Sequence, residues 1–415
     1  MGGFRDFYLK VLKADELNVR FAGPIFIFML FSASVFLLAS WYADDGGTFD
    51  FPANLSLAEH EDFAAFYRAG EMAREGEAVD AYDYYQFSKY FSESNRFLLF
   101  LNPPHALLFF EPLSLFSYPV AKAIFMAINA IFLIGAIHLV RMNLGVWPYF
   151  FAIASAGAVY SFQLLQIAPI TTFLLLFALL RSREQPLLAG LALSVLTIKP
   201  QFGLLVPIFL IARQDWRAFG AAAVGSSILM LVSVFVYGFP VWQAFMASLA
   251  GGVHSIQFEA PHSMMITVGQ TLGKFGSPVE FRTVLQILML PVFASVVWWA
   301  ARSLRKEAAV SISLLAMAIA APSFLFYDWL IYSVALLLMA KVMPKWPISL
   351  QVTGGVLWIA PVIHDVIYQH NQAAAMYFSG FIPFLAVLVL ILAVFCFRDE
   401  KVDLTSLVSD KDSVA

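Results

Sequence analysis

The feature that most constrains this chain is a series of long apolar runs, each close in length to a bilayer crossing. The runs recur between residues 23 and 397 and are continuous rather than alternating, which predicts helices. In hydrocarbon only helices or closed barrels satisfy the backbone hydrogen bonds. The chain is 61% hydrophobic and only 13% charged, whereas a soluble domain carries about twice that charged fraction. The sequence therefore predicts an all-α polytopic membrane protein.

The expected organisation is one transmembrane domain, 23–397, between a cytoplasmic N-terminus, 1–22, and a cytoplasmic tail, 398–415. The acidic segment 44–96 is predicted as the first external loop and 238–281 as a second long external loop. About 12 spans are expected. They cover 23–43, 119–140, 147–165, 167–180, 186–198, 200–212, 216–237, 282–302, 308–323, 327–343, 346–367 and 376–397.

The basic residues predict the orientation of these spans. Cytoplasmic loops of membrane proteins carry an excess of Lys and Arg. All the Lys/Arg clusters fall on one side if the proline-punctuated segment 102–140 makes one net crossing, with 104–117 as a bent or half-membrane helix. The clusters are Arg141, Arg181/Arg183, Arg213/Arg217, Arg302/Arg305/Lys306, Lys341/Lys345 and Arg398/Lys401. The other, external face then carries the acidic loop and most of the unusual polar residues.

Asp62 is the first candidate for chemistry, because it lies in a segment with twelve acidic and four basic residues, 44–96. The pattern Ser56-Leu57-Ala58-Glu59 matches a capping box, so a helix is expected to start there and to stop at Gly76. A carboxylate on such a helix can act as a general base, and its like-charged neighbours Glu59 and Glu61 would raise its pKa. The alternative is a solvated acidic face. Tyr67 is predicted to share one face of this helix with other aromatic residues.

Lys199 is the second candidate, because it stands within the apolar tract LALSVLTIKPQFGLLVPIFL. A lysine there is costly unless it meets an anion, a cavity or the interface, and Pro200 breaks the helix beside it. A phosphate at the membrane surface is the predicted partner, with Gln201 next to it. The alternative is a lysine that snorkels in an external turn.

Several other polar residues occur at predicted external helix ends, and each also has a structural interpretation. Gln166 can bind sugar hydroxyls or bridge helices, and Asn102 and His105 flank the extended Pro103-Pro104 entry into the next helix. Asp328 can contact a substrate or cap a helix. His254 and His262 lie in the second external loop in a spacing that fits no metal motif. No metal is therefore predicted, and without a basic tract no nucleic acid partner is expected.

Five tracts in order give the chain a resemblance to glycosyltransferase family 87, a group of GT-C fold membrane enzymes that includes polyprenol-phosphate-mannose-dependent mannosyltransferases. They are DFAAFYRAGEMAREGEAVDAYD (62–83), NPPHALLFFEPLSLFSYPVA (102–121), Gln166, AGLALSVLTIKPQFGLLVPIFLIARQDWRAF (189–219) and PSFLFYDWLIYSVALLL (322–338). Two departures stand out. Leu165 replaces the glycine that precedes Gln166 in the family pattern, and Ser323 stands where relatives often carry His.

The resemblance implies a GT-C-like bundle that transfers a sugar, mannose or another hexose, from a polyprenyl-phosphate donor with inversion. Asp62 would deprotonate the acceptor, and Lys199 with Gln201 would bind the donor phosphate. Gln166, Tyr67, Asn102, His105, His254, His262 and Asp328 would bind substrate.

The expected partners are the lipid-linked donor, membrane lipid and a glycan or glycolipid acceptor, with no cofactor. The expected location is the bacterial inner membrane, with the site on the periplasmic side. Two alternatives remain open on the residues: a transporter or flippase of a lipid-linked saccharide, although no internal repeat is seen, and a structural or assembly subunit.

Overall fold

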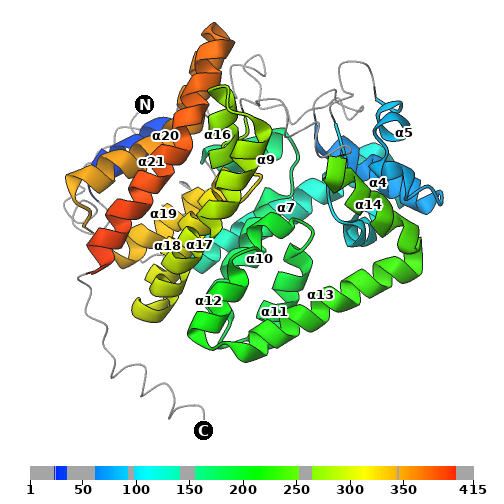
Figure 1. Ribbon diagram of the computed structural model, residues 1–415, viewed down its shortest axis with the longest axis horizontal. Coiled ribbons are helices and arrows are strands. Elements are labelled where there is room, and N and C mark those ends of the chain that lie inside the picture. Colours follow the sequence, from blue (N-terminus) through cyan, green and yellow to red (C-terminus); the bar gives the residue numbers. More distant parts are fainter. Residues whose placement is uncertain are drawn as a thin grey trace, which may run out of the picture.

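The computed structural model describes residues 23, 25–34, 61–91, 98–140, 155–251, 264–343 and 345–398. Within these residues the chain is helical, and the β structure described consists of one isolated bridge between Met265 and Leu325. A helix over Ile25–Ser34 comes first. The later elements are α4 (Phe63–Arg74), η1 (Asp80–Tyr82), α5 (Tyr84–Ser88), η3 (Pro104–Ala106), α6 (Leu107–Phe110), η4 (Glu111–Leu115), α7 (Tyr118–Val140), α9 (Ala156–Gln163), α10 (Ala168–Arg181), α11 (Pro186–Leu196), η5 (Pro200–Phe202), α12 (Val206–Arg213), α13 (Trp216–Tyr237), α14 (Phe239–Gly251), α16 (Val268–Lys274), α17 (Val279–Ser303), α18 (Lys306–Ala320), η6 (Phe326–Trp329), α19 (Leu330–Val342), α20 (Ile348–His370) and α21 (Gln372–Arg398) (Figure 1).

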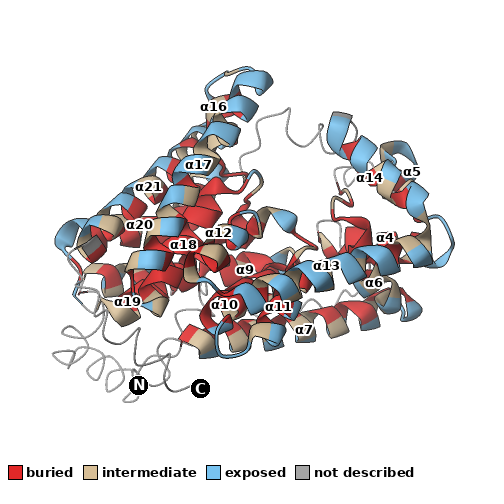
Figure 2. Ribbon diagram, turned by 60° about the horizontal axis from the view of Figure 1, so that its bottom comes forward, coloured by how far each residue is buried: buried red, intermediate tan, exposed pale blue. Residues whose placement is uncertain are grey.

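Helix α13 shows most directly that the protein belongs in a membrane. Its 22 residues are strongly apolar, yet only two of them are buried, and Phe235 is 91% exposed (Figure 2). A soluble protein does not leave so large an apolar surface in water. In a bilayer the same surface faces lipid at no cost, and α7, α17, α20 and α21 are also long and apolar enough to cross.

Most predicted spans coincide with helices, but the expected count of about 12 is not confirmed. Among the described residues, five helices reach crossing length, and four shorter apolar stretches, such as Ala168–Arg181, accompany them. The segment 104–117 is a set of short turns interrupted by Pro112, too short to cross the bilayer in one straight helix. In the described part of the predicted long loop 238–281 lie α14, α16 and the start of α17.

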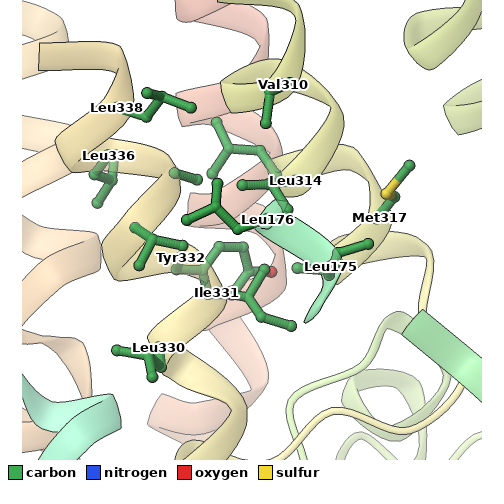
Figure 3. Close-up of a cluster of buried hydrophobic side chains, with 14 of the residues drawn as sticks. Leu175, Leu176, Val310, Leu314, Met317, Leu330, Ile331, Tyr332, Leu336 and Leu338 are labelled. Carbon is green, nitrogen blue, oxygen red and sulfur yellow. The ribbon is translucent and has the colours of Figure 1, made fainter. Parts of the chain in front are cut away.

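The described residues pack into two hydrophobic cores. The larger core joins α9–α12 and α16–α21, and a cluster of mainly aliphatic side chains from α10, α18 and α19, with Tyr332 among them, packs within it (Figure 3). The smaller core joins α4, η1, α5, α6, the first half of α7 and α14. In Figure 2 helices α16–α21 of the larger core stand at one end of the molecule and α4, α5, α6 and α14 of the smaller core at the other, with α9, α10 and α11 between them. The junction of the two cores is where the polar candidates meet.

The basic residues gather at one end of the bundle, as the sequence predicts. The side chain of Arg183 bonds the carboxylate of Asp215 at 2.8 Å and the carbonyl of Arg213 at 2.6 Å. Nearby on the neighbouring helices, Lys306 pairs with Glu184 at 2.5 Å, and further bonds link Arg302 to Ala212 and Lys341 to Glu307. These contacts tie the ends of α10, α12, α17, α18 and α19 into one charged rim.

This rim predicts the topology. In a Cys396→Ser background, a cysteine at Arg183 should resist a membrane-impermeant maleimide on intact cells, and one at Tyr85, 80% exposed in α5, should be labelled. Both should react after permeabilisation, which controls for accessibility. Labelling of a cysteine at position 183 on intact cells would show that the predicted orientation in the membrane is wrong.

Candidate functional site

Asp62 is held in place at the first turn of α4 by the chain that follows α9. Its backbone N–H donates to the carbonyl of Leu164 at 2.9 Å, and its Oδ2 accepts from Nε2 of Gln166 at 2.6 Å. The amide oxygen of Gln166 accepts from the N–H of Ile167, which fixes the orientation of the amide. Asp62 and Gln166, two separate candidates from the sequence, therefore form one hydrogen-bonded unit, with the second carboxylate oxygen of Asp62 left to other partners.

Helix α4 is anchored by the acidic residue before Asp62. Glu61 is buried and forms an ion pair with Lys122 of α7, and it also accepts from the hydroxyl of Tyr118 at 3.2 Å. The expectation that Glu61 acts as a bare like charge beside Asp62 is therefore wrong, because Lys122 neutralises it. Glu59 lies outside the described residues, as does the predicted capping box. The predicted stop is confirmed: α4 ends at Arg74, and Gly76 takes a positive φ of 83°.

The pKa of Asp62 is raised as predicted, but by a different cause. Burial raises the pKa of Asp62 to about 6, because an ionised carboxylate loses hydration there. The hydrogen bond from Gln166 and the charge of Lys199 lower it, and the charge of Asp328 raises it. A carboxyl group with such a pKa is ionised near neutral pH and remains basic enough to accept a proton.

Lys199 meets an anion, as its cost in apolar sequence requires, and that anion belongs to the protein. Its Nζ bonds Oδ1 of Asp328 at 2.9 Å, and the ring of Tyr327 lies 4.7 Å from the ammonium. Both charged residues are buried. Oδ2 of Asp328 also accepts from the N–H of Leu325, so Asp328 fulfils the capping role and binds the lysine as well.

Small residues bring the supporting helices close enough to form this site. At Gly157 of α9, a side chain would lie 2.1 Å from the backbone N of Leu330, so only glycine lets α9 touch η6 and α19. One turn later Ser161 donates to the carbonyl of Tyr327 at 2.9 Å. The end of α9, from which the chain leads to Gln166, is thereby placed against the turn that carries Asp328.

The end of α11 is fixed in the same manner. At Gly190 a side chain would lie 2.3 Å from Cβ of Ala221 in α13, and the hydroxyl of Ser194 reaches the carbonyl of Ala222 at 3.3 Å. Close contacts of this type are typical of helix pairs in membranes. Beyond α11, Nδ2 of Asn102 donates to the carbonyl of Ile198 at 2.8 Å, next to Lys199.

Of the remaining predicted residues, Asn102 and Gln201 lie beside Lys199, whereas His105 and Tyr67 bond to other parts of the chain. Asn102 supports Lys199, and Gln201 lies in η5, the turn directly after that lysine. His105 stacks on Trp242 and lies 3.0 Å from the hydroxyl of Thr197, and burial lowers its pKa to about 4, so it is neutral at pH 7. The hydroxyl of Tyr67 donates to the carbonyl of Phe116 within the smaller core.

Two predicted residues, His254 and His262, lie outside the described residues. In the part of the chain that is described, no three His, Cys, Asp or Glu side chains form a group that suits a metal ion. Lys122 is a residue that the sequence analysis missed. Its signal was present, since a lysine inside a predicted span must find an anion.

These features define a helical membrane protein with a buried carboxylate, amide and lysine site where the two cores meet. The chain belongs to glycosyltransferase family 87, whose family model matches residues 100–327 and so more than half of the sequence. It is therefore a membrane glycosyltransferase. The match contains Gln166 and Lys199, whereas Asp62 precedes it and Asp328 directly follows it. No curated protein and no solved structure gives a significant match.

The buried ion pair gives a prediction that separates stability from chemistry. Lys199→Met leaves Asp328 buried without its partner, which costs about 3–5 kcal/mol of unfolding free energy. The double variant Lys199→Met/Asp328→Asn removes both charges and should recover most of that loss, since a neutral amide needs no counter-ion. Thermal unfolding of the detergent-solubilised protein measures both. Equal thermal stability of Lys199→Met and the wild type would show that the Lys199–Asp328 ion pair does not stabilise the fold.

Proposed function

We propose that the protein transfers a hexose, with inversion, from a polyprenyl-phosphate donor to a lipid- or glycan-linked acceptor hydroxyl. The proposal includes a GT-C-type mechanism on the external face of a bacterial inner membrane, with no cofactor. The observation that carries it is the placement of Asp62, a carboxylate with a pKa of about 6, within the electrostatic range of Lys199. A family 87 glycosyltransferase needs a base for the acceptor and a cation for a leaving phosphate, and these two residues supply them.

The reaction follows from the roles of these two groups. Asp62 accepts the proton of the acceptor hydroxyl through the carboxylate oxygen that Gln166 does not occupy. The acceptor oxygen attacks the anomeric carbon, the bond from that carbon to the phosphate oxygen breaks, and the electron pair leaves with polyprenyl phosphate. A single displacement inverts the anomeric configuration. One carboxylate suffices, because a phosphate leaving group needs no proton, unlike the leaving group of a glycosidase.

Lys199 stabilises the negative charge that develops on the departing phosphate. An ammonium held in a buried site acts strongly because little water screens it and because it does not need to reorganise. Asp328 holds this ammonium at 2.9 Å and is therefore a positioning residue. Gln166 is likewise a positioning residue, because its hydrogen bond holds the carboxylate of Asp62.

A transporter or flippase of a lipid-linked saccharide is the second reading. It shares the lipid substrate but needs no base, and membership of a glycosyltransferase family favours transfer. Sugar transfer by the purified protein in nanodiscs distinguishes the two, because a transporter moves its lipid without making a new glycosidic bond.

Asp62→Asn should bind the donor normally and fail to turn over. The substitution keeps the shape of the side chain and removes its ability to accept a proton, and the loss of a positioned base costs about 10²–10⁴-fold in rate. The measurement is turnover of a polyprenyl-phosphate sugar in nanodiscs, with donor binding followed in parallel. Glu77→Gln, the same change at an exposed acid just after α4, is the control and should leave the rate unchanged. Turnover of Asp62→Asn within about threefold of wild type would remove Asp62 from the role of base.

The rate should rise with pH through an apparent pKa near 6. Asp62 works only when ionised, and burial holds its pKa at about 6, so the active fraction grows as the pH passes that value. Gln166→Leu removes a hydrogen bond that favours the ionised form, so the same limb should move to higher pH. The pH dependence of kcat for both proteins tests this. If the rise of kcat with pH has the same apparent pKa in Gln166→Leu as in the wild type, a group other than Asp62 controls that rise.

A further inference from the structure

Tyr327 is a polar residue of the Asp62–Lys199 site to which the proposed reaction gives no role. It directly precedes Asp328 in η6, and its side chain is buried, with 8% exposed. Its backbone carbonyl accepts from the hydroxyl of Ser161 at 2.9 Å. Among the described residues, however, its phenol hydroxyl has no hydrogen-bond partner. The turn thus places a free hydroxyl group at the site.

The hydroxyl of Tyr327 differs from the other unpaired polar groups of the described residues. Polar groups inside a protein are nearly always hydrogen-bonded, because hiding them from water without a partner is unfavourable. Several described side-chain atoms that lack a partner are fully enclosed, among them Nε1 of Trp329. The hydroxyl of Tyr327 is not one of these enclosed atoms. Part of its surface is therefore accessible, so that a molecule in the site can form the missing bond.

The rest of Tyr327 is held in place by the residues around it. The ammonium of Lys199 lies 4.7 Å from the ring centroid and so occupies one face of the ring. The bond from Ser161 fixes the backbone against α9. A group held in this way loses little freedom when it binds a ligand. The hydroxyl is the part of the residue that remains to be used.

The proposed reaction requires the transferred sugar to lie beside Tyr327. In a single displacement the acceptor oxygen and the leaving phosphate stand on opposite sides of the anomeric carbon. The sugar must therefore lie between Asp62, which takes the acceptor proton, and Lys199, which binds the phosphate. Tyr327 is close to both, since its ring contacts Lys199 and its phenol lies within the electrostatic range of the Asp62 carboxylate. Its hydroxyl borders the space between them.

A phenol hydroxyl suits a sugar hydroxyl better than it suits the other reacting groups. A tyrosine ionises only near pH 10, so at neutral pH it is an uncharged group that both donates and accepts. It brings no charge for the phosphate and is not the stronger base beside a carboxylate. A sugar hydroxyl also donates and accepts, so the two can pair in either direction.

We propose that Tyr327 is a specificity-determining residue whose hydroxyl bonds one hydroxyl group of the transferred hexose. The inference rests on the proposed function and adds a direct contact with the sugar to it. A site that bonds a substrate hydroxyl discriminates against an analogue without that hydroxyl, because its own polar group is then left unpaired. Tyr327 would thus select among hexose donors, whereas Asp328 beside it acts through Lys199.

Tyr327→Phe tests the contact, because it removes the hydroxyl and nothing else. The ring keeps its place against Lys199 and no bond within the described residues is lost, so thermal stability should equal that of the wild type. Two probes are bound to the protein in nanodiscs: polyprenyl-phosphate mannose and polyprenyl phosphate without a sugar. The Kd of the mannose donor should rise by about 2–10-fold, as expected for one hydrogen bond. The Kd of bare polyprenyl phosphate should stay the same, because its phosphate and lipid contacts remain.

A second measurement identifies the partner of the Tyr327 hydroxyl on the sugar. The kcat/KM of the mannose donor is compared with that of each of its monodeoxy analogues, in the wild type and in Tyr327→Phe. For one analogue the loss should be about 2–10-fold smaller in the variant than in the wild type, because the two missing hydroxyls are partners of each other. The other analogues should show the same loss in both proteins. Glucose donors form a parallel set.

Tyr237→Phe is the matched control. Its hydroxyl donates to Oε2 of Glu111 at 2.6 Å, a bond between the end of α13 and η4. The same substitution there should lower thermal stability, because it breaks a bond to a charged group. It should leave the Kd of both probes and the discrimination among deoxy donors unchanged.

The outcomes separate this inference from the proposed function. An unchanged Kd for the sugar donors in Tyr327→Phe, equal weakening of both probes, or no analogue with a smaller loss overturns the inference, even if sugar transfer is observed. A changed apparent pKa of kcat with unchanged sugar discrimination also overturns it, since the hydroxyl would then act on Asp62. If Tyr327→Phe weakens only the sugar donor and the wild type transfers no sugar, the contact stands and the proposed function fails.

Discussion

The ion pair between Lys199 and Asp328 is the interaction around which the site is built, because each partner lies in a part of the chain that cannot hold its charge alone. Lys199 follows α11, and Asp328 lies in η6 between α18 and α19, both buried in apolar surroundings. Removing water from either group costs several kcal/mol, so each needs the other. The pair therefore fixes the ends of two helices that are far apart in sequence, and Gln166 and Asp62 reach it through the packing of α9 against η6.

A second buried pair, Glu61 with Lys122, explains why Asp62 can be both buried and reactive. A carboxylate at the start of a helix would ordinarily turn towards water. Here the preceding residue is bound to α7 and the backbone of Asp62 to Leu164, so the carboxylate is held at the junction of the two cores. The contacts of Glu61 with Lys122 and of the Asp62 backbone with Leu164 hold the Asp62 carboxylate in a buried position that is unfavourable for its charge. Carboxylates with a shifted pKa are common at functional sites.

The helices could largely be predicted from the sequence, because a run of apolar residues has few other stable forms in a membrane. Helix α13 falls on its predicted span, and the basic rim was visible in the spacing of Lys and Arg. The partners of the polar residues could not be predicted. Lys199 had to meet an anion, but the sequence offered no means of choosing Asp328 over a substrate phosphate, since the two lie 129 positions apart. For the same reason the sequence did not reveal that Lys122 pairs with Glu61. The raised pKa of Asp62 was therefore assigned to its acidic neighbours rather than to burial.

Leu165 shows how a departure from the family pattern is accommodated. It stands where the pattern has glycine, and its φ is 49°, in the left-handed region where a side chain costs about 1–2 kcal/mol. The conformation turns the chain after α9, so that the amide of Gln166 points to Asp62. The side chain of Leu165 is buried in the smaller core, and that burial contributes about as much as the strain costs. The turn that directs Gln166 towards Asp62 is thus made here by a leucine whose packing offsets its left-handed conformation.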